Sequence, residues 1–510
     1  MIPQPLNPVT ELTRGHLLAR NAVWNLIGNG APMGVAVFSI PILISGLGKE
    51  RFGVLALAWA LIGYAGLFDL GLGRALTQLV AKKLGAGEDQ EVPTLVWTSL
   101  LLMLLLGLVG AAVVMLASPP FVRHVLNVPA ALQPETLGAF YLLGLSIPLV
   151  ITTAGLRGLL EAYQRFGIIN ALRIPLGVYT FASPLLVLPF SRNLIPVVAV
   201  LVLGRLIGLI AHLWLCLRVT PGLRQTVIWK RAAAGPLLRS GGWMTVSNTV
   251  SPLLVTLDRF LIGALVSMTA VAYYATPYEV VTKFLFVPGA LMGVMFPAFS
   301  TSFVQDRARA AVLYGRCVKY LVLILFPAIL VTVGLAQYGL TLWLGADFAQ
   351  HSFRVLQWLA VGVFLNSLAQ VPFALIQGCG RPDLTAKLHL IELPFYLLGL
   401  WWLISTHGIE GVAIAWTVRV AFDTVVLFGL AQGLLPECLP ASRQTLLSVL
   451  IAITVLLSAT LPTTPTAKIV FLFAVLMAFL PVGWFLALAS EERALIGSGL
   501  KPFQVSLHGD

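Results

Sequence analysis

Eleven ionisable residues lie inside long apolar stretches of this sequence. They are Asp69, Arg74, Arg173, Arg205, Asp258, Arg259, Glu279, Lys283, Glu392, Arg419 and Asp423. Each charge costs about 2.5–3.5 kcal/mol at the centre of a membrane-spanning helix, so together they cost on the order of 30 kcal/mol, less for those near an interface. Such charges are explained if they line a hydrated cavity or pair across helices. The basic residues among them would suit an anionic ligand.

Two of these charge pairs have the spacing of neighbours on one helix face. Glu279 and Lys283 are four residues apart, and so are Arg419 and Asp423. Opposite charges at this spacing can neutralise each other on their own helix. The sequence leaves both interpretations open for each pair, a self-contained ion pair or a contact with substrate.

The other basic residues have fewer local partners. Asp258 and Arg259 are adjacent, so on a helix their side chains point about 100° apart and cannot fully neutralise each other. Arg205 has no acid within one turn of its own helix, so it needs a partner elsewhere or an anionic ligand. We therefore predict a set of substrate-binding cations that consists of Arg74, Arg205, Arg259, Lys283 and Arg419. Arg74 is also explained as an ordinary basic residue at the inner rim.

The acidic residues are candidates for ion coupling. A proton or a sodium ion could bind at Asp69, Asp258, Glu279, Glu392 or Asp423. A membrane potential could also act on a cationic cavity, and the sequence does not choose among these driving forces. The scattered His212, His389 and His407 are interpreted as packed polar residues, and the four cysteines show no paired spacing. No metal site, catalytic residue, nucleotide loop or bound cofactor is expected.

The composition indicates a membrane protein. Of 510 residues, 58% are hydrophobic and only 10% are charged, against about 25% charged in a typical soluble domain. A soluble enzyme, a nucleic-acid-binding module and a disordered chain are excluded. The net charge of +12 is assigned to cytoplasmic loops rather than to a nucleic-acid partner.

Apolar runs bounded by charges and Pro-Gly breaks predict fourteen membrane-spanning helices. The fourteen spans cover approximately residues 20–47, 52–79, 92–117, 136–160, 168–189, 194–217, 241–266, 270–299, 312–337, 355–378, 384–405, 411–432, 444–461 and 467–489. The prediction is therefore an all-α polytopic membrane protein.

A polar basic stretch divides the spans into two groups. The predicted domains are a first lobe of six spans (1–217), a cytoplasmic linker (218–240), a second lobe of six spans (241–433), a terminal pair of spans (434–490) and a cytoplasmic tail (491–510). A weak repeat at a shift of 219 residues pairs Trp24 with Trp243 and Pro175 with Pro394. Two parallel halves around a central cavity are typical of transporters.

The basic residues also predict the orientation. With the N-terminus placed in the cytoplasm, the cytoplasmic segments and rims hold 20 Lys and Arg residues, and the outer segments hold 6. The positive-inside rule then places both termini in the cytoplasm. All four cysteines fall on the cytoplasmic side, where thiols stay reduced.

Several of these segments resemble a known transporter family. The run RNAVWN at 20–25 and the stretch LGKERFGVLALAWALIGYAGLFDLGLGRALTQLVAKKLG at 47–85 resemble the polysaccharide-transport branch of the multidrug/oligosaccharidyl-lipid/polysaccharide (MOP) exporter superfamily. Residues 377–394 and 407–423 are similar to the second half of the same family. Its members are the Wzx-type flippases for O-antigen and exopolysaccharide repeat units. Within the FDLGLGR stretch the resemblance extends to Asp69 and Arg74.

The resemblance implies a MATE-like fold of fourteen helices, in two six-helix lobes with a terminal pair outside. It implies a flippase of the bacterial inner membrane that breaks no covalent bond and is not an enzyme. Its substrate would be an oligosaccharide on undecaprenyl diphosphate, moved by alternating access from the cytoplasmic to the periplasmic leaflet. Expected partners are membrane lipids and the polymerase and chain-length proteins of the pathway. A lipid II flippase and a cation-coupled drug antiporter of the MATE type stay as alternatives.

Overall fold

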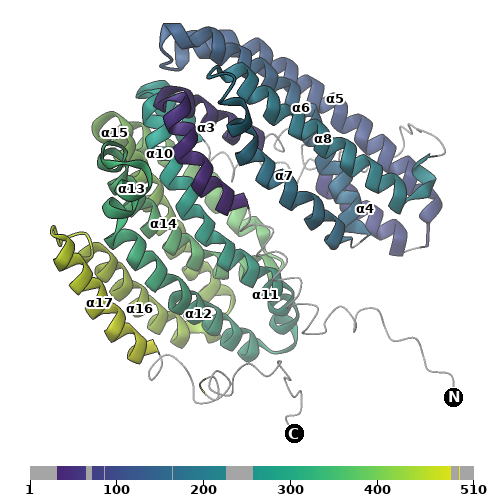
Figure 1. The fold of residues 1–510 in the computed structure, drawn as a ribbon. Coiled ribbons are helices and arrows are strands. Elements are labelled where there is room, and N and C mark those ends of the chain that lie inside the picture. The colour runs from purple at the N-terminus through teal and green to yellow at the C-terminus, as the bar shows by residue number, and fades with distance from the viewer. Residues whose placement is uncertain are drawn as a thin grey trace, which may run out of the picture. The chain divides into compact units, whose positions relative to one another are not determined.

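The computed structural model describes residues 32–64, 72–85, 87–163, 165–224 and 257–483, together with Arg493 (Figure 1). Across these residues the chain contains fourteen helices of seven or more residues and no strand. Six of the helices have the length and apolar composition needed to cross a membrane, the longest reaching from Pro382 to Leu434. The all-α membrane fold predicted from the sequence is confirmed.

The described residues fall into two compact units. Unit 2 contains Ile27–Pro277 and His389–Ala415, and unit 1 contains Tyr278–Leu388 and the chain from Trp416 onward. The units are defined by which residues contact one another. They group residues 257–277 and 389–415 with the helices of the first half. The lobe boundaries drawn from the sequence stay a prediction.

The first half of the chain forms helices in each of its six predicted spans, but the described residues of the predicted span 52–79 belong to two separate helices. The helices of this half are Pro32–Leu47, α3 (Lys49–Tyr64), α4 (Leu72–Gly85), α5 (Val92–Pro120), α6 (Gln133–Ala162), α7 (Phe166–Val187) and α8 (Leu194–Val219). Short 3-10 or π turns join them at Asp89–Glu91, Phe121–Val125, Ala130–Leu132 and Pro221–Arg224. The predicted spans 92–117, 136–160, 168–189 and 194–217 each match one helix within three residues at every end.

The second half departs from the prediction in three places. Its elements are a helix at 257–265, α10 (Met268–Val281), a 3-10 turn (Thr282–Leu285), α11 (Phe286–Gln305), α12 (Arg307–Gly334), α13 (Ala336–Leu344), α14 (Ala346–Gly378), α15 (Pro382–Leu434), a 3-10 turn (Pro436–Cys438), α16 (Leu439–Ser458) and α17 (Pro465–Pro481). The predicted span 270–299 is interrupted by the 3-10 turn. The short α13 was not predicted, and α14 begins nine residues before the predicted span at 355.

Local sequence signals explain where several helices begin and bend. The side chains of Asn193 and Asp306 cap α8 and α12, accepting the N–H groups of Ile195 at 2.8 Å and Arg309 at 3.0 Å. Such caps satisfy donors that a helix start leaves unpaired. Spans eleven and twelve join in α15 through Gly408, whose φ of +57° and ψ of −136° interrupt the helix. Glycine adopts this backbone conformation without steric cost.

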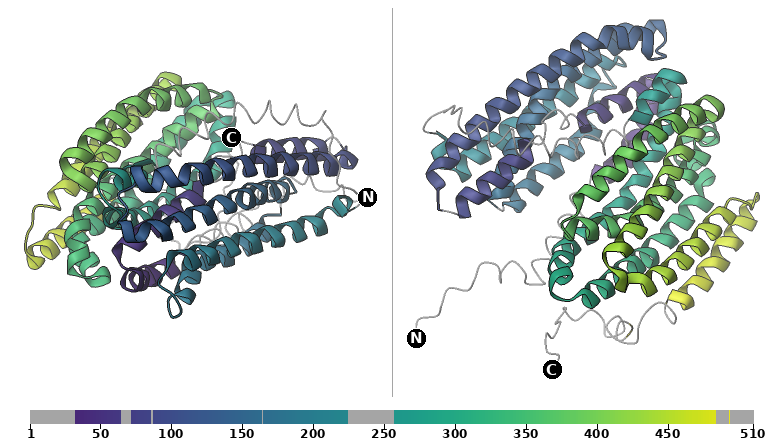
Figure 2. Two further views of the ribbon diagram at one scale, coloured as in Figure 1. Left: turned by 90° about the horizontal axis from the view of Figure 1, so that it is seen from above. Right: turned by 180° about the vertical axis from the view of Figure 1, so that it is seen from behind.

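Close backbone contacts hold the helices of unit 2 together. α6 packs against both α5 and α8, and the three run side by side in Figure 1 and in the turned views of Figure 2. A Cβ on Gly107 of α5 would lie only 2.5 Å from the Pro148 Cα of α6. Small residues allow such approach between helices in lipid, where association depends on packing rather than on the hydrophobic effect.

Unit 1 is built around α14. In the most apolar stretch of this helix 83% of the residues are buried. The helices α11, α12 and α13 pack against it. The terminal helices α16 and α17 pack on α12, where Leu472 fills the space beside Gly334 and the Phe326 and Phe479 rings are 5.0 Å apart. Figure 1 shows this pair in yellow at the edge of unit 1.

Turns that the charge count places on one side of the membrane meet in unit 2. Arg51, at the start of α3, forms a two-pronged ion pair with Glu135 of α6, at 2.9 Å for both bonds. The same carboxylate accepts the N–H of Leu194 at the start of α8, at 3.3 Å. One carboxylate therefore ties three helix starts together, and we call this group the Arg51–Glu135 clamp.

Exchanging the two charged residues of the clamp tests its contribution to stability. We expect Glu135→Arg alone to lower the midpoint of thermal unfolding in detergent by several degrees, because two cations then face each other. The double exchange, Arg51→Glu with Glu135→Arg, should recover most of that loss. Arg157→Glu, at an exposed ion pair with Glu161, is the control and should change the midpoint little. A double exchange no more stable than the single variant would contradict a stabilising pair.

Candidate functional site

Two candidate residues fall where no side-chain geometry is described. Asp69 lies outside the described residues, and of Arg74 only the main chain, in α4, is described. The roles predicted for them therefore stay predictions.

Arg205 is a half-buried cation on α8. A Cβ on the preceding Gly204 would lie 2.4 Å from the ring of Tyr179, so α7 and α8 are closely packed at this level. Over the ranges that the structure describes, no acidic side chain pairs with Arg205. An anionic ligand would stabilise a half-buried guanidinium in an apolar helix. The partner expected for Arg205 beyond its own helix stays a prediction.

Asp258 and Arg259 are both buried, with 1% and 4% of their surfaces exposed. The Asp258 carboxylate accepts the Tyr274 hydroxyl at 2.5 Å and the main-chain N–H of Arg259 at 2.7 Å. It thus connects the helix at 257–265 to α10. The bond between the adjacent residues uses the Arg259 backbone, and the role predicted for the Arg259 side chain stays a prediction.

Glu279 and Lys283 form the ion pair that their spacing allows. The Lys283 ammonium lies 3.0 Å from the Glu279 carboxylate, at the junction where α10 passes into the 3-10 turn. The side chains are 25% and 39% exposed, so the pair is partly accessible. Because its charge is already balanced locally, Lys283 is a weaker candidate for an anionic ligand than Arg205.

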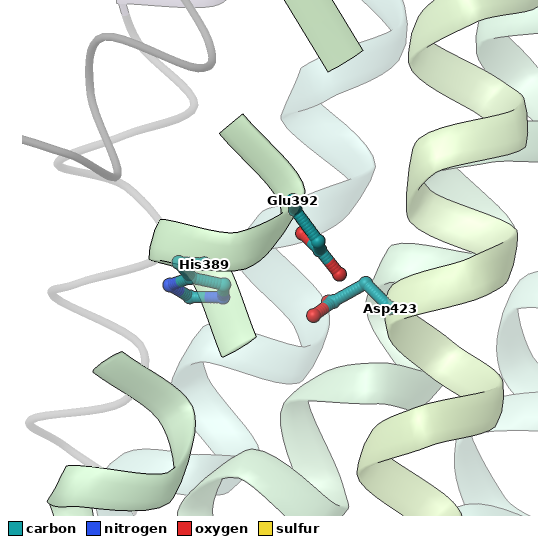
Figure 3. A group of neighbouring side chains, drawn as sticks. All are labelled: His389, Glu392 and Asp423. Atoms are coloured by element: carbon teal, nitrogen blue, oxygen red, sulfur yellow. The ribbon is translucent and has the colours of Figure 1, made fainter. Parts of the chain in front are cut away.

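The remaining candidates lie on α15. Figure 3 shows His389 and Glu392 on its first segment and Asp423 on its second. Glu392 and Asp423 are 3% and 7% exposed, and Arg419 is half-buried. His389 and Glu392 are one turn apart in unit 2, whereas Arg419 and Asp423 belong to unit 1. Buried carboxylates in a membrane helix can exchange protons or bind a cation, so Glu392 and Asp423 keep their predicted coupling role as a proposal.

The histidines differ from one another in their surroundings. His212 is buried, with its Nδ1 2.7 Å from the Gly208 carbonyl oxygen, as expected of a packed polar residue. His407 is exposed and lies 2.8 Å from the Thr406 hydroxyl, so the prediction that it is packed was wrong. It follows Ser405 and Thr406 at the end of an apolar run, a polar cluster that already indicated a helix end.

Local acids partly balance the cationic inner rim that the sequence indicates. Lys83 forms ion pairs with Glu88 and Glu91, and Arg157 lies 3.4 Å from Glu161. The Glu88 carboxylate raises the pKa of the Lys83 ammonium. Sequence reasoning counted the bases and missed these acids, although their short spacing was visible. Two of the basic rim residues are therefore engaged with carboxylates.

Comparison with known proteins agrees with the resemblance. Residues 18–303 match the family model described as polysaccharide biosynthesis protein. A Shigella flexneri protein provisionally named an O-antigen transporter is 32% identical over 415 residues, covering 80% of this chain and 96% of that protein.

Solved structures share the fold at low sequence identity. An inward-facing multidrug resistance MATE family transporter of the MOP superfamily is 14% identical with a TM-score of 0.69, over 81% of this chain and 98% of that one. A MOP superfamily transporter from Pyrococcus furiosus is 15% identical with a TM-score of 0.62, over 85% and 99%. The fold is therefore that of the MOP transporters, and the extent of the sequence match places this chain in the polysaccharide biosynthesis protein family.

Proposed function

We propose that the protein is a flippase that moves oligosaccharide repeat units on undecaprenyl diphosphate across the bacterial inner membrane. It takes them from the cytoplasmic to the periplasmic leaflet by alternating access. The observation that carries this proposal is the 32% identity, over most of both chains, with the Shigella protein named for O-antigen transport.

The charges in the spans support an anionic substrate. Among the eleven ionisable residues of the apolar stretches, six are basic and five are acidic. Lys283 is paired with Glu279, and Arg259 is buried. Arg205, by contrast, is half-buried and has no acidic partner over the described ranges. A diphosphate cannot enter hydrocarbon without compensating charge. Arg205 is thus our first choice for a contact with the diphosphate.

Deleting the gene and identifying the stalled lipid intermediates tests the proposal. We expect surface polymer to be lost and complete repeat units on undecaprenyl diphosphate to accumulate in the cytoplasmic leaflet, as seen by mass spectrometry of extracted lipids. Sensitivity to cationic dyes should hardly change. Accumulated lipid II would favour the lipid II flippase, and normal polymer with strong dye hypersensitivity would favour the drug antiporter.

The structure sharpens the test of orientation. Cys216, Cys317 and Cys438 are buried and Cys379 is half-buried, so failure of the native thiols to react says little about the side on which they lie. Ala130, Asp347 and Glu437 are all exposed. We expect a membrane-impermeant maleimide to label Ala130→Cys and Asp347→Cys on intact cells. Glu437→Cys should be labelled only after permeabilisation, and its labelling from outside would overturn the orientation.

A further inference from the structure

We propose that the turn at 263–268 and the ends of α3 and α5 form a releasable latch that keeps the outer side of the transporter closed. The latch consists of Asn127, Gly53, Gly263 and Met268 with the carbonyls of Ala264 and Val266. All of these residues lie in unit 2. The inference rests on the proposed function for its direction of transport, because the charge count places these turns on the periplasmic side.

Asn127 supplies the hydrogen bonds of the latch. α5 ends at Pro119-Pro120 and passes through the π turn Phe121–Val125 into the extended Leu126, and Asn127 follows. Its main-chain N–H donates to the Gly263 carbonyl at 2.8 Å, and its side-chain amide donates to Ala264 at 2.7 Å.

The same amide reaches the carbonyl of Val266 at 3.4 Å. The Gly263 and Ala264 carbonyls lie in the last turn of the helix at 257–265, where a helix end leaves carbonyls without intrahelical donors, and Val266 directly follows that helix. One residue of the first half therefore caps a helix of the second half.

Glycines make the close approach possible. A Cβ on Gly53 of α3 would lie 1.9 Å from the Met268 carbonyl oxygen, a distance that no other residue type could tolerate without a backbone shift. A Cβ on Gly263 would lie 2.7 Å from the Met268 methyl group and 3.2 Å from Leu126. The Met268 backbone therefore lies directly against α3, and the absence of a side chain at Gly263 leaves room for the Met268 and Leu126 side chains.

The two helices on either side of the turn are joined to each other. The bond from the Tyr274 hydroxyl to Asp258 links the helix at 257–265 to α10, and Asp258 is almost completely buried. The residues from 257 to 277 are therefore joined as one hydrogen-bonded hairpin. The Phe121 ring contacts the Phe260 ring of this hairpin, with centroids 6.2 Å apart. The contact therefore combines an apolar ring pair at Phe260 with the hydrogen bonds that Asn127 donates to the hairpin.

The latch and the Arg51–Glu135 clamp have different chemistry at the same end of unit 2. The clamp is a two-pronged ion pair that joins helices of the first half to one another. The latch joins the hairpin to that half through amide–carbonyl bonds, and Asn127 is itself exposed. Water can replace such bonds when they part, so each adds only a small net free energy. A contact that opens in every transport cycle must be weak enough for the open and closed states to have similar free energies.

Cross-linking tests whether the latch must open. In a variant whose four native cysteines are replaced by alanine, Asn127→Cys and Ala264→Cys are combined and bridged by a short bifunctional methanethiosulfonate. We expect bridging to lower polymer export at least ten-fold and reduction to restore it, whereas Asn127→Cys alone should be unaffected by the reagent. Equal export before and after complete bridging would overturn the proposal.

A labelling experiment tests the latch with a readout that does not depend on the substrate. Met268 is 1% exposed, so Met268→Cys should react slowly with an impermeant maleimide on intact cells. Adding Asn127→Ala should raise the rate at least five-fold.

The matched control is Gln133→Ala at the start of α6, because its amide donates to the Val128 carbonyl in the connection from α5, and it should leave the rate unchanged. Equal rates for the two alanine variants would overturn the latch. Loss of the proposed function would appear instead as a wild-type protein that exports no lipid-linked oligosaccharide, with the labelling difference preserved.

Discussion

Arg205→Glu is expected to abolish polymer export while the protein still reaches the membrane in normal amount. The side chain is half-buried on α8 and has no acidic partner over the described ranges, so reversing its charge places an anion where the diphosphate would bind. A hydrogen bond to a charged group is worth about 1.5–3 kcal/mol, so even Arg205→Ala should slow transport by about 10- to 100-fold. Arg205→Lys should do less harm than Glu, because it keeps the charge and loses only the two-pronged geometry.

Export is measured as surface polymer per cell, and the amount of inserted protein by immunoblotting of membranes. Lys283→Ala provides an internal comparison, since its ammonium is already paired with Glu279, and its effect should be smaller than that of Arg205→Ala. If Arg205, Arg259, Lys283 and Arg419 can each be replaced by alanine with normal export, the cationic-path hypothesis is wrong and these residues are structural.

Gly107→Leu is expected to cause a large loss of stability. Its Cβ would lie 2.5 Å from the Cα of Pro148 and 2.9 Å from its Cβ, so α5 and α6 must separate, and the rest of the leucine side chain needs still more room. Overpacking of a tight contact costs about 1–3 kcal/mol and occasionally more. We expect a lower midpoint of thermal unfolding in detergent and a lower yield of folded protein.

A matched substitution at an open glycine separates crowding from a general intolerance of larger residues. Gly399 lies on α15, and a Cβ added there would meet no neighbouring atom within 4 Å, so Gly399→Leu should leave the midpoint nearly unchanged. The intermediate Gly107→Ala should fall between the wild type and Gly107→Leu. Equal midpoints for Gly107→Leu and Gly399→Leu would show that the α5–α6 contact yields without cost.

The sequence predicted the order of the helices because each membrane span must be apolar over its own length. The spans that became α5 to α8 were therefore found nearly to the residue. The 3-10 turn at 282–285 and the separate α13 were missed, since a hydropathy pattern does not distinguish one continuous helix from two consecutive helices. Gly408 interrupts α15 within a polar cluster that was predicted to separate two spans.

The contacts of the candidate site were less predictable, because they depend on residues far apart in the chain. The i, i+4 spacing offered the Glu279–Lys283 ion pair as one of two open interpretations, and the structure contains that pair. By contrast, Arg51 and Glu135 are 84 residues apart, and Asn127 meets Ala264 across 137. In a sequence, nothing local to Asn127 distinguishes a residue that caps another helix from an ordinary loop asparagine.

The burial of α14 has a consequence for the synthesis of the protein. The helix carries polar residues in its interior, and Gln357 donates to the Val333 carbonyl of the preceding α12 at 3.0 Å. Later residues complete its cover: Thr417 donates to the Trp358 carbonyl at 2.8 Å, and Trp416 packs on Gly362. While the ribosome is still making the intervening chain, one flank of α14 has only lipid or an insertion factor as its neighbour. Nascent chains that stop before residue 416 therefore present an unfinished surface to membrane quality control.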